Sequence, residues 1–239
     1  MNFTDESRND IQKLDIYLVI GQSNMAGRAE IRDEDSESLE GVYLFTGHDS
    51  LAWTVAKNPL NLYSTVRKKV EMQRLGPAYA FARSVKAAKP DKEIGLVVNA
   101  LGGTKIVQWL PGTRLYTEAI KRTREALQYG ELKGVIWHQG ESDCDPIRVP
   151  LYLGRIEILI NAIREEFEIP NLPFIAGQVF ENEKRHAFNE MLMLLPGFIK
   201  NTAVVSSEGT SVFDGTHFDS ESANLLGSRY AEEILKLMK

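Results

Sequence analysis

The chain has 239 residues, of which 43% are hydrophobic and 26% charged, which is typical of a globular protein with a sizeable core. The formal net charge of -5 argues against a basic face that would bind nucleic acid or an anionic membrane surface. The single cysteine excludes an intramolecular disulfide, and no apolar run approaches the ~20 residues of a membrane-spanning helix. The polar, acidic N-terminus carries no signal-peptide pattern, so a cytoplasmic location is expected.

Five short apolar runs, most of them rich in β-branched residues, are predicted to be strands. They lie at residues 16–20, 94–98, 135–137, 173–180 and 203–205. Strands that are buried on both faces have continuous apolar sequences rather than alternating ones. The runs therefore favour a parallel sheet that is covered by helices on both sides.

Segments with helical periodicity separate most of these runs. The pattern predicts helices at residues 77–89, 113–129, 152–167 and 182–195, and a last one that begins at Asp219 or Ser220. Alternation of strands and helices at this spacing is typical of βαβ units, so we expect one doubly wound α/β domain over residues 1–239. Residues 28–75 are charged, rich in turns and poorly periodic, which predicts an inserted loop region over the sheet.

A serine follows the first predicted strand, within the string GQSNMAGR at residues 21–28. Ligands of open parallel sheets bind at the carboxyl ends of the strands, so this turn can present a hydroxyl nucleophile. The nucleophile elbow G-x-S-x-G has a second glycine where this chain has Met25. Ser23 is therefore a candidate nucleophile, and the alternative is a helix cap.

Two adjacent glycines, Gly102 and Gly103, follow the second predicted strand. Backbone N–H groups at such a pair can converge on an anion, which suits an oxyanion hole. The alternative is a tight turn that needs positive φ.

Polar side chains crowd the end of the third predicted strand, in the string WHQGESDCD at residues 137–145. The amide of Gln139 could donate to a developing oxyanion. Cys144 has no catalytic partner and is expected to fill space. The alternative for this segment is a metal site, although no H-E-x-x-H or paired-cysteine pattern supports it. Its ligands would be His138, Glu141, Asp143 and Asp145.

Asp214 and His217 lie three residues apart, just before the last predicted helix. The carboxylate would fix the tautomer of the imidazole, and the imidazole would take the proton of a serine hydroxyl. The alternative is an Asx-type turn. With Ser23 these residues supply a nucleophile, a base and an orienting acid, all expected at one edge of the sheet.

Four blocks of the sequence resemble those of the sialate O-acetylesterase-like branch of the SGNH (GDSL-like) hydrolases. This branch includes carbohydrate esterase family 6 and its acetylxylan esterases. The blocks are GQSNMAGR at 21–28, GGT at 102–104, HQGESD at 138–143 and DGTHF at 214–218. The resemblance implies a flavodoxin-like three-layer α/β/α sandwich with a five-stranded parallel sheet. It also implies a serine esterase that removes acetyl groups from sugars without a metal or other cofactor.

The resemblance assigns roles to individual residues. Ser23 matches the nucleophile, His217 the base and Asp214 the acid of the family. Glu141 matches a glutamate that we expect to position the loop after the third strand. The oxyanion donors match the backbone N–H groups of Ser23 and Gly103, with Gly102 as second choice, and the amide of Gln139.

The expected substrates are acetylated xylo-oligosaccharides or similar sugars, with acetylated sialic acid or general short-chain esters as alternatives. Candidates to line the sugar site are Trp109, Lys105, Arg114 and the charged loop at residues 28–75, and the alternative for Trp109 is a place in the core. Rival hypotheses are a lipase or thioesterase for longer acyl chains, a metal-dependent hydrolase, and a catalytically silent carbohydrate-binding domain. The intact set of Ser23, Asp214 and His217 argues against the last, because a binding domain has no use for a nucleophile with its base.

Overall fold

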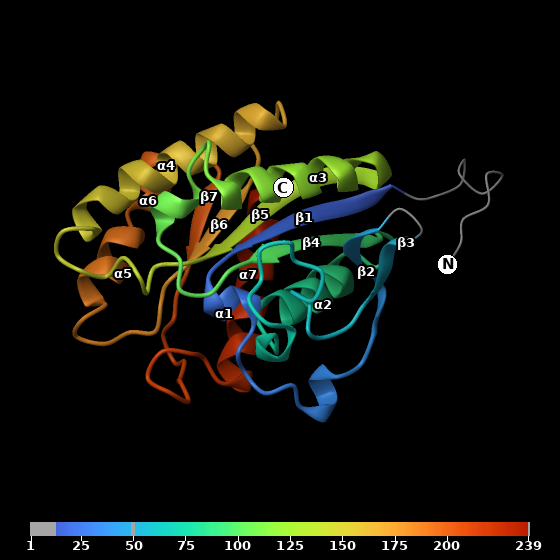
Figure 1. Ribbon diagram of the computed structural model, residues 1–239, viewed down its shortest axis with the longest axis horizontal. Helices are drawn as coiled ribbons and strands as arrows, with labels where there is room; N and C mark the ends of the chain where they lie inside the picture. Colours follow the sequence, from blue (N-terminus) through green and yellow to red (C-terminus); the bar gives the residue numbers. More distant parts are fainter. Residues whose placement is uncertain (1–12, 49–50, 239) are drawn as a thin grey trace.

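The computed structural model describes residues 13–48 and 51–238, and its strands form one sheet in the order β3-β2-β4-β1-β5-β6-β7 (Figure 1). All neighbouring strands are parallel except β2 and β3. The strands are β1 (Leu14–Gly21), β2 (Leu39–His48), β3 (Leu51–Ala56), β4 (Ile94–Ala100), β5 (Gly130–His138), β6 (Phe174–Gly177) and β7 (Thr202–Val205).

The five predicted strands correspond to β1, β4, β5, β6 and β7, but the predicted strand count was wrong. Two more strands, β2 and β3, lie within residues 28–75, which we expected to be an inserted loop region. In β2 the side chains of Val42 and Leu44 are buried, while Tyr43 between them is partly exposed. This short alternation, next to Glu40 and Gly41, is typical of a strand near a sheet edge and lacks the continuous apolar sequence of the central strands.

The main helices lie close to their predicted positions. They are α2 (Ala78–Ala88), α3 (Arg114–Ala126), α4 (Val149–Glu166), α5 (His186–Leu192) and α7 (Ser220–Leu237), with short α1 (Ser23–Ala26) and α6 (Leu195–Phe198). The helix expected at 182–195 is shorter than predicted. The side chain of Asp219 accepts a hydrogen bond from the N–H of Ser222 at 2.9 Å, so Asp219 is the N-cap of α7.

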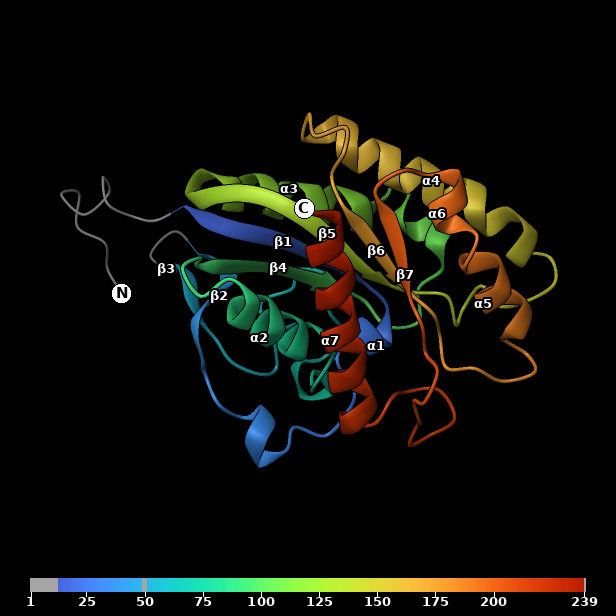
Figure 2. The same ribbon diagram turned by 180° about the vertical axis from the view of Figure 1, so that it is seen from behind.

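The helices cover both faces of the sheet, which gives three layers (Figures 1 and 2). Alternate side chains of β1 enter two separate cores. Ile16 and Leu18 pack in the core that contains α3 and α4, whereas Tyr17 and Val19 pack in the core that contains α2 and α7. Both faces of each central strand are therefore apolar, which explains the continuous apolar sequences. Within the described part of the chain, no helix has the length and hydrophobicity that a bilayer crossing requires.

The strand order determines where the polar loops meet. Because β1 lies between β4 and β5, the loops that follow these three parallel strands share one edge of the sheet. The long segment between β7 and α7, residues 206–219, returns to the same edge, as its hydrogen bonds to the β1 loop show.

Candidate active site

Three side chains form a hydrogen-bonded chain at this edge. His217 Nε2 is 3.0 Å from Ser23 Oγ, and His217 Nδ1 is 2.6 Å from Asp214 Oδ2. The structure thus brings together the three residues that the sequence indicated, from segments 194 positions apart in the chain. This is the arrangement in which an imidazole can accept the proton of a hydroxyl nucleophile.

Asp214 fixes both the loop and the imidazole. Its Oδ1 accepts hydrogen bonds from the N–H groups of Thr216 and His217, so the expected alternative of an Asx-type turn is also present. Burial alone would raise the pKa of Asp214, but the hydrogen bonds from the His217 side chain and from these two N–H groups outweigh burial and lower it. An ionised Asp214 can only accept, so Nδ1 of a neutral His217 carries the proton and Nε2 is free to accept from Ser23.

Gly21 allows the turn that presents Ser23. Its φ is +144°, and a Cβ atom there would lie 2.2 Å from the carbonyl oxygen of His138 on the neighbouring strand β5. Ser23 is the first residue of α1, separated from the end of β1 by one residue, and it is 6% exposed. The Ser23 side chain is therefore largely buried beside the base.

Gly102 allows the β4 loop to approach the nucleophile. A Cβ on Gly102 would lie 3.1 Å from Ser23 Cβ, whereas Gly103 has a φ of +78° and more open surroundings. Among the described residues, no backbone acceptor takes the N–H of Ser23, Gly102 or Gly103. These N–H groups are therefore available as donors beside Ser23.

The side chain of Gln139 differs from our expectation. We predicted a free amide that faces an oxyanion, but Gln139 is fully buried and its Nε2 is already surrounded by acceptors. It lies 2.7 Å from Asp143 Oδ2 and 2.8 Å from the carbonyl oxygen of Thr104, with Gln22 Oε1 at 3.1 Å. An amide has two N–H groups, so in this conformation neither is left for a ligand.

The four residues of the alternative metal site do not share a centre. Each uses its side chain in a different contact within the fold. The contacts join His138 Nδ1 to Tyr230 Oη, Glu141 to Asn24, Asp143 to the N–H of Ile106, and Asp145 to Arg148. Within the described ranges, no group of three or more histidine, cysteine or acidic residues is arranged to hold a metal ion.

Two further predicted features lie away from the triad. Trp109, a candidate for the sugar site, is fully buried instead, because its Nε1 donates to Thr104 Oγ1 at 3.0 Å and its ring packs on Trp137. Cys144 is half-buried, and burial with nearby acidic groups raises the pKa of its thiol to about 12. The raised pKa favours the protonated thiol over the nucleophilic thiolate.

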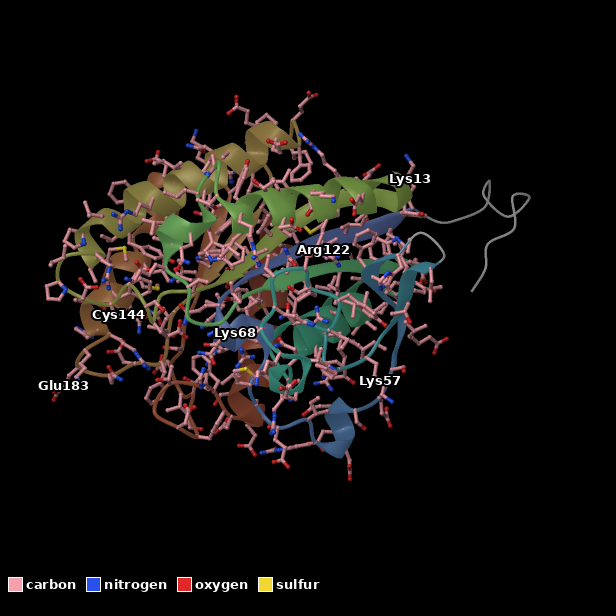
Figure 3. All side chains as sticks on the ribbon, in the orientation of Figure 1. Lys13, Lys57, Lys68, Arg122, Cys144 and Glu183 are labelled. Carbon is pink, nitrogen blue, oxygen red and sulfur yellow. The ribbon has the colours of Figure 1, made fainter. Side chains whose placement is uncertain are left out.

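Three cationic side chains, Arg28, Lys68 and Arg185, lie at the site. Lys68 belongs to the charged loop region that was expected to line a sugar site, whereas no sequence pattern pointed to Arg185. A Cβ on Gly102 would lie 2.9 Å from Arg28 Nη2, and one on Gly103 would lie 3.6 Å from Lys68 Nζ (Lys68 is labelled in Figure 3). Arg185 Nη2 donates to Thr216 Oγ1 at 3.0 Å, next to His217. They come from three separate loops, so no sequence motif connects them.

The fold is shared by solved structures of a class of hydrolases that includes a putative GDSL-like lipase from Parabacteroides merdae and a lipase/acylhydrolase from Enterococcus faecalis. NanS has a TM-score of 0.75 at 18% identity, over 94% of this chain and 97% of that chain. XAC1771, a carbohydrate acetylesterase from Xanthomonas citri, has a TM-score of 0.62 at 18% identity, over 94% of this chain and 55% of that chain.

The sequence itself identifies the family within this class. The family model described as "Carbohydrate esterase, sialic acid-specific acetylesterase" matches residues 13–236. The Arabidopsis thaliana protein named "Probable carbohydrate esterase At4g34215" is 30% identical in an alignment of 252 residues that covers 96% of this chain and 94% of that protein. Its X-ray structure has a TM-score of 0.84 at 29% identity, over 94% of this chain and 98% of that one. The chain therefore belongs to the sialic acid-specific acetylesterase family of carbohydrate esterases.

Proposed function

We propose that this carbohydrate esterase removes acetyl groups from acetylated xylo-oligosaccharides or similar sugars by a metal-free acyl-enzyme mechanism, with Ser23, His217 and Asp214 as its triad. The observation that carries the proposal is the hydrogen-bonded chain from Asp214 through His217 to Ser23, with distances of 2.6 and 3.0 Å. An exposed or isolated serine would lack the base that makes its hydroxyl nucleophilic at neutral pH.

The mechanism has two halves that use the same imidazole. His217 Nε2 takes the proton of Ser23 as Oγ attacks the acetyl carbonyl, and then gives this proton to the departing sugar oxygen. In the second half, His217 removes a proton from water as the water oxygen attacks the acetyl-serine. The proton returns to Ser23 Oγ, and acetate leaves. Ionised Asp214 stabilises the imidazolium that forms in each half.

The oxyanion of each tetrahedral intermediate needs donors that are fixed before the reaction. The backbone N–H groups of Ser23 and Gly103, with Gly102 as second choice, are assigned this role because the β4 loop approaches Ser23 at Gly102 and these N–H groups have no backbone acceptor in the described chain. Gln139 stabilises the β4 loop that carries Gly102 and Gly103, because its amide donates a hydrogen bond to the carbonyl oxygen of Thr104.

A second substrate class is favoured by the cations around the site. Arg28, Lys68 and Arg185 lie beside Gly102, Gly103 and Thr216, in a protein whose net charge is -5. A carboxylate on the sugar would be attracted by this local positive charge. Acetylated sialic acid, which carries a carboxylate, is therefore the second candidate beside neutral acetylated xylo-oligosaccharides.

The test is hydrolysis of p-nitrophenyl acetate at neutral pH by the wild type and by Ser23→Ala, each with and without EDTA. We expect turnover that is insensitive to EDTA and falls at least ~10³-fold in Ser23→Ala. Ser36→Ala, whose hydroxyl donates an exposed hydrogen bond to the carbonyl oxygen of Asp33, is the control and should keep full activity.

Other outcomes identify the rival hypotheses. Loss of activity with EDTA would indicate a metal-dependent mechanism instead of the triad. Faster turnover of octanoate esters than of acetate esters would indicate a lipase. Sugar binding without turnover would indicate a silent binding domain. If the triad is established, kcat/KM for acetylated xylo-oligosaccharides and for acetylated sialic acid decides between the two substrate classes.

A further inference from the structure

Asn24, the residue after the nucleophile, holds the backbone on both sides of His217. Its Nδ2 donates to the carbonyl oxygen of Thr216 at 3.2 Å, and its Oδ1 accepts from the N–H of Phe218 at 3.1 Å. Asn24 is 4% exposed, so water competes little for these bonds. One side chain thus ties the peptide groups that flank the base to the turn that carries the nucleophile.

Glu141 completes this contact from a third segment, the loop after β5. Its Oε1 accepts the second N–H of Asn24 Nδ2 at 2.5 Å. Oε2 is buried and has no hydrogen-bond partner within the described chain, so Asn24 is the residue through which Glu141 connects to the site. Every N–H and the carbonyl oxygen of the Asn24 amide are therefore engaged, which fixes the orientation of the amide.

The base needs such support because it lies on a long segment with no helix or strand, in which a single bridge joins Val212 and Phe218. Residues 206–219 run from β7 to α7, and His217 reaches across to β1 from near their end. A displacement of about 1 Å between reacting groups can lower a rate about 10²-fold. The hydrogen bond between His217 and Ser23 therefore depends on what holds residues 216 and 218 in place.

We propose that Asn24 is a positioning residue that sets the distance between His217 and Ser23, and that Glu141 acts through Asn24 by holding its amide. Asn24 itself touches none of the reacting atoms. In this role Glu141 is a hydrogen-bond acceptor for Asn24 and not a second acid of the triad. This inference rests on the proposed function of Ser23 and His217.

The first experiment compares Asn24→Ala with a matched control, Asn189→Ala. Asn189 in α5 makes the same pattern of contacts away from the triad: its Nδ2 donates to the Val179 carbonyl and to Glu181, and its Oδ1 accepts from the Val179 N–H. We expect a similar loss of thermal stability in both variants. Only Asn24→Ala should lower kcat for p-nitrophenyl acetate, by about 10²-fold, with KM changed less than threefold. Equal kcat values in the two variants would overturn the proposal.

The second experiment tests whether Glu141 acts by hydrogen bonding through Asn24. Glu141→Gln keeps an acceptor oxygen for Asn24 and should retain kcat within about threefold, whereas Glu141→Ala should lower kcat at least tenfold. The double variant with Asn24→Ala should be no slower than Asn24→Ala alone, because the two residues act in series. A Glu141→Gln variant as slow as Glu141→Ala would assign the role to the charge instead. The comparison of Glu141→Gln with Glu141→Ala also tests the proposal if Asn24→Ala does not fold.

A third measurement separates this inference from the proposed function. A fluorophosphonate probe is attacked by Ser23 Oγ, which displaces fluoride while His217 takes the proton, so labelling reports on the pair without any sugar substrate. A wild type that is not labelled at Ser23 would refute the proposed triad. Labelling of Asn24→Ala at the wild-type rate would leave the triad intact and refute only the role of Asn24.

Discussion

Gln139 lies at the centre of a buried polar network beneath the candidate oxyanion site. Besides the three acceptors near its Nε2, its Oε1 accepts a hydrogen bond from the hydroxyl of Tyr152 at 2.9 Å. Asp143, which is fully buried, accepts from Gln139 and from the N–H of Ile106. The network joins the loops after β1, β4 and β5, so the catalytic turn depends on side chains that no substrate touches.

The variant Gln139→Ala should therefore lose stability as well as activity. Removing the amide leaves the carboxylate of Asp143 with one donor fewer, which should cost about 1–3 kcal/mol in the free energy of unfolding. Urea denaturation and kcat are measured together, with Gln128→Ala, at an exposed position after α3, as the control. An unchanged denaturation midpoint with a kcat lowered ~10²–10³-fold would show instead that the amide turns to the oxyanion during the reaction.

For individual residues, positions in the site could be predicted from the sequence, but side-chain contacts could not. The position of Ser23 after a predicted strand, and those of Asp214 and His217 before the last predicted helix, followed from the order of apolar runs and turns. The engaged amide of Gln139 did not, because its acceptors come from three loops whose approach depends on the whole sheet. The burial of Trp109 likewise depends on Thr104 and Trp137, which an isolated segment does not reveal.

At the scale of elements, the contact between α2 and α7 depends on Gly227. A Cβ at this position would lie 2.3 Å from the carbonyl oxygen of Pro77 and 2.8 Å from the Cβ of Ala80. The backbones of the two helices therefore approach more closely than any other residue would allow. Since α7 directly follows the segment with His217, this packing also anchors the base.

The variant Gly227→Ala should destabilise the protein by about 1–3 kcal/mol, because the added methyl group forces the helices apart. Gly154→Ala in α4 is the matched control: nothing lies within 4 Å of its Cβ position, so the better helix propensity of alanine should stabilise the protein by ~0.5–1 kcal/mol. Thermal unfolding should show opposite shifts, of about 2–4 °C per kcal/mol. Stabilisation by both substitutions would contradict the close approach of α2 and α7.

Secondary structure was predictable where an element is buried in a regular way. The continuous apolar sequences of β1 and β4 and the stripes of α4 and α7 reflect burial between layers. The hairpin of β2 and β3 was missed because an edge hairpin is held by pairing with its neighbours and has a mixed sequence. Its antiparallel register includes irregularities, which weaken the alternation further.

For the whole molecule, the negative net charge contrasts with the three cationic side chains that lie beside the site. The net charge of -5 would repel an anionic sugar, yet Arg28, Lys68 and Arg185 lie beside the candidate nucleophile and base. Interactions between charges that are exposed to solvent weaken with salt, because the screening length falls from about 30 Å at 0.01 M to about 3 Å at 1 M. The two candidate substrate classes should therefore respond differently to ionic strength.

If the substrate is an acidic sugar, kcat/KM for acetylated sialic acid should fall severalfold between 0.01 and about 0.5 M salt, whereas kcat/KM for p-nitrophenyl acetate should stay constant. Lys68→Ala should lower the first value about threefold at low salt and leave the second unchanged, because an exposed charge near a ligand contributes below ~1 kcal/mol. Lys69→Ala is the matched control, since it removes the same charge from the adjacent exposed residue, whose ammonium lies 4.0 Å from Glu71. Equal effects of the two substitutions would mean that only the overall charge matters. A kcat/KM for acetylated sialic acid that is independent of salt would favour a neutral sugar, because the cations would then contribute no attraction for the substrate.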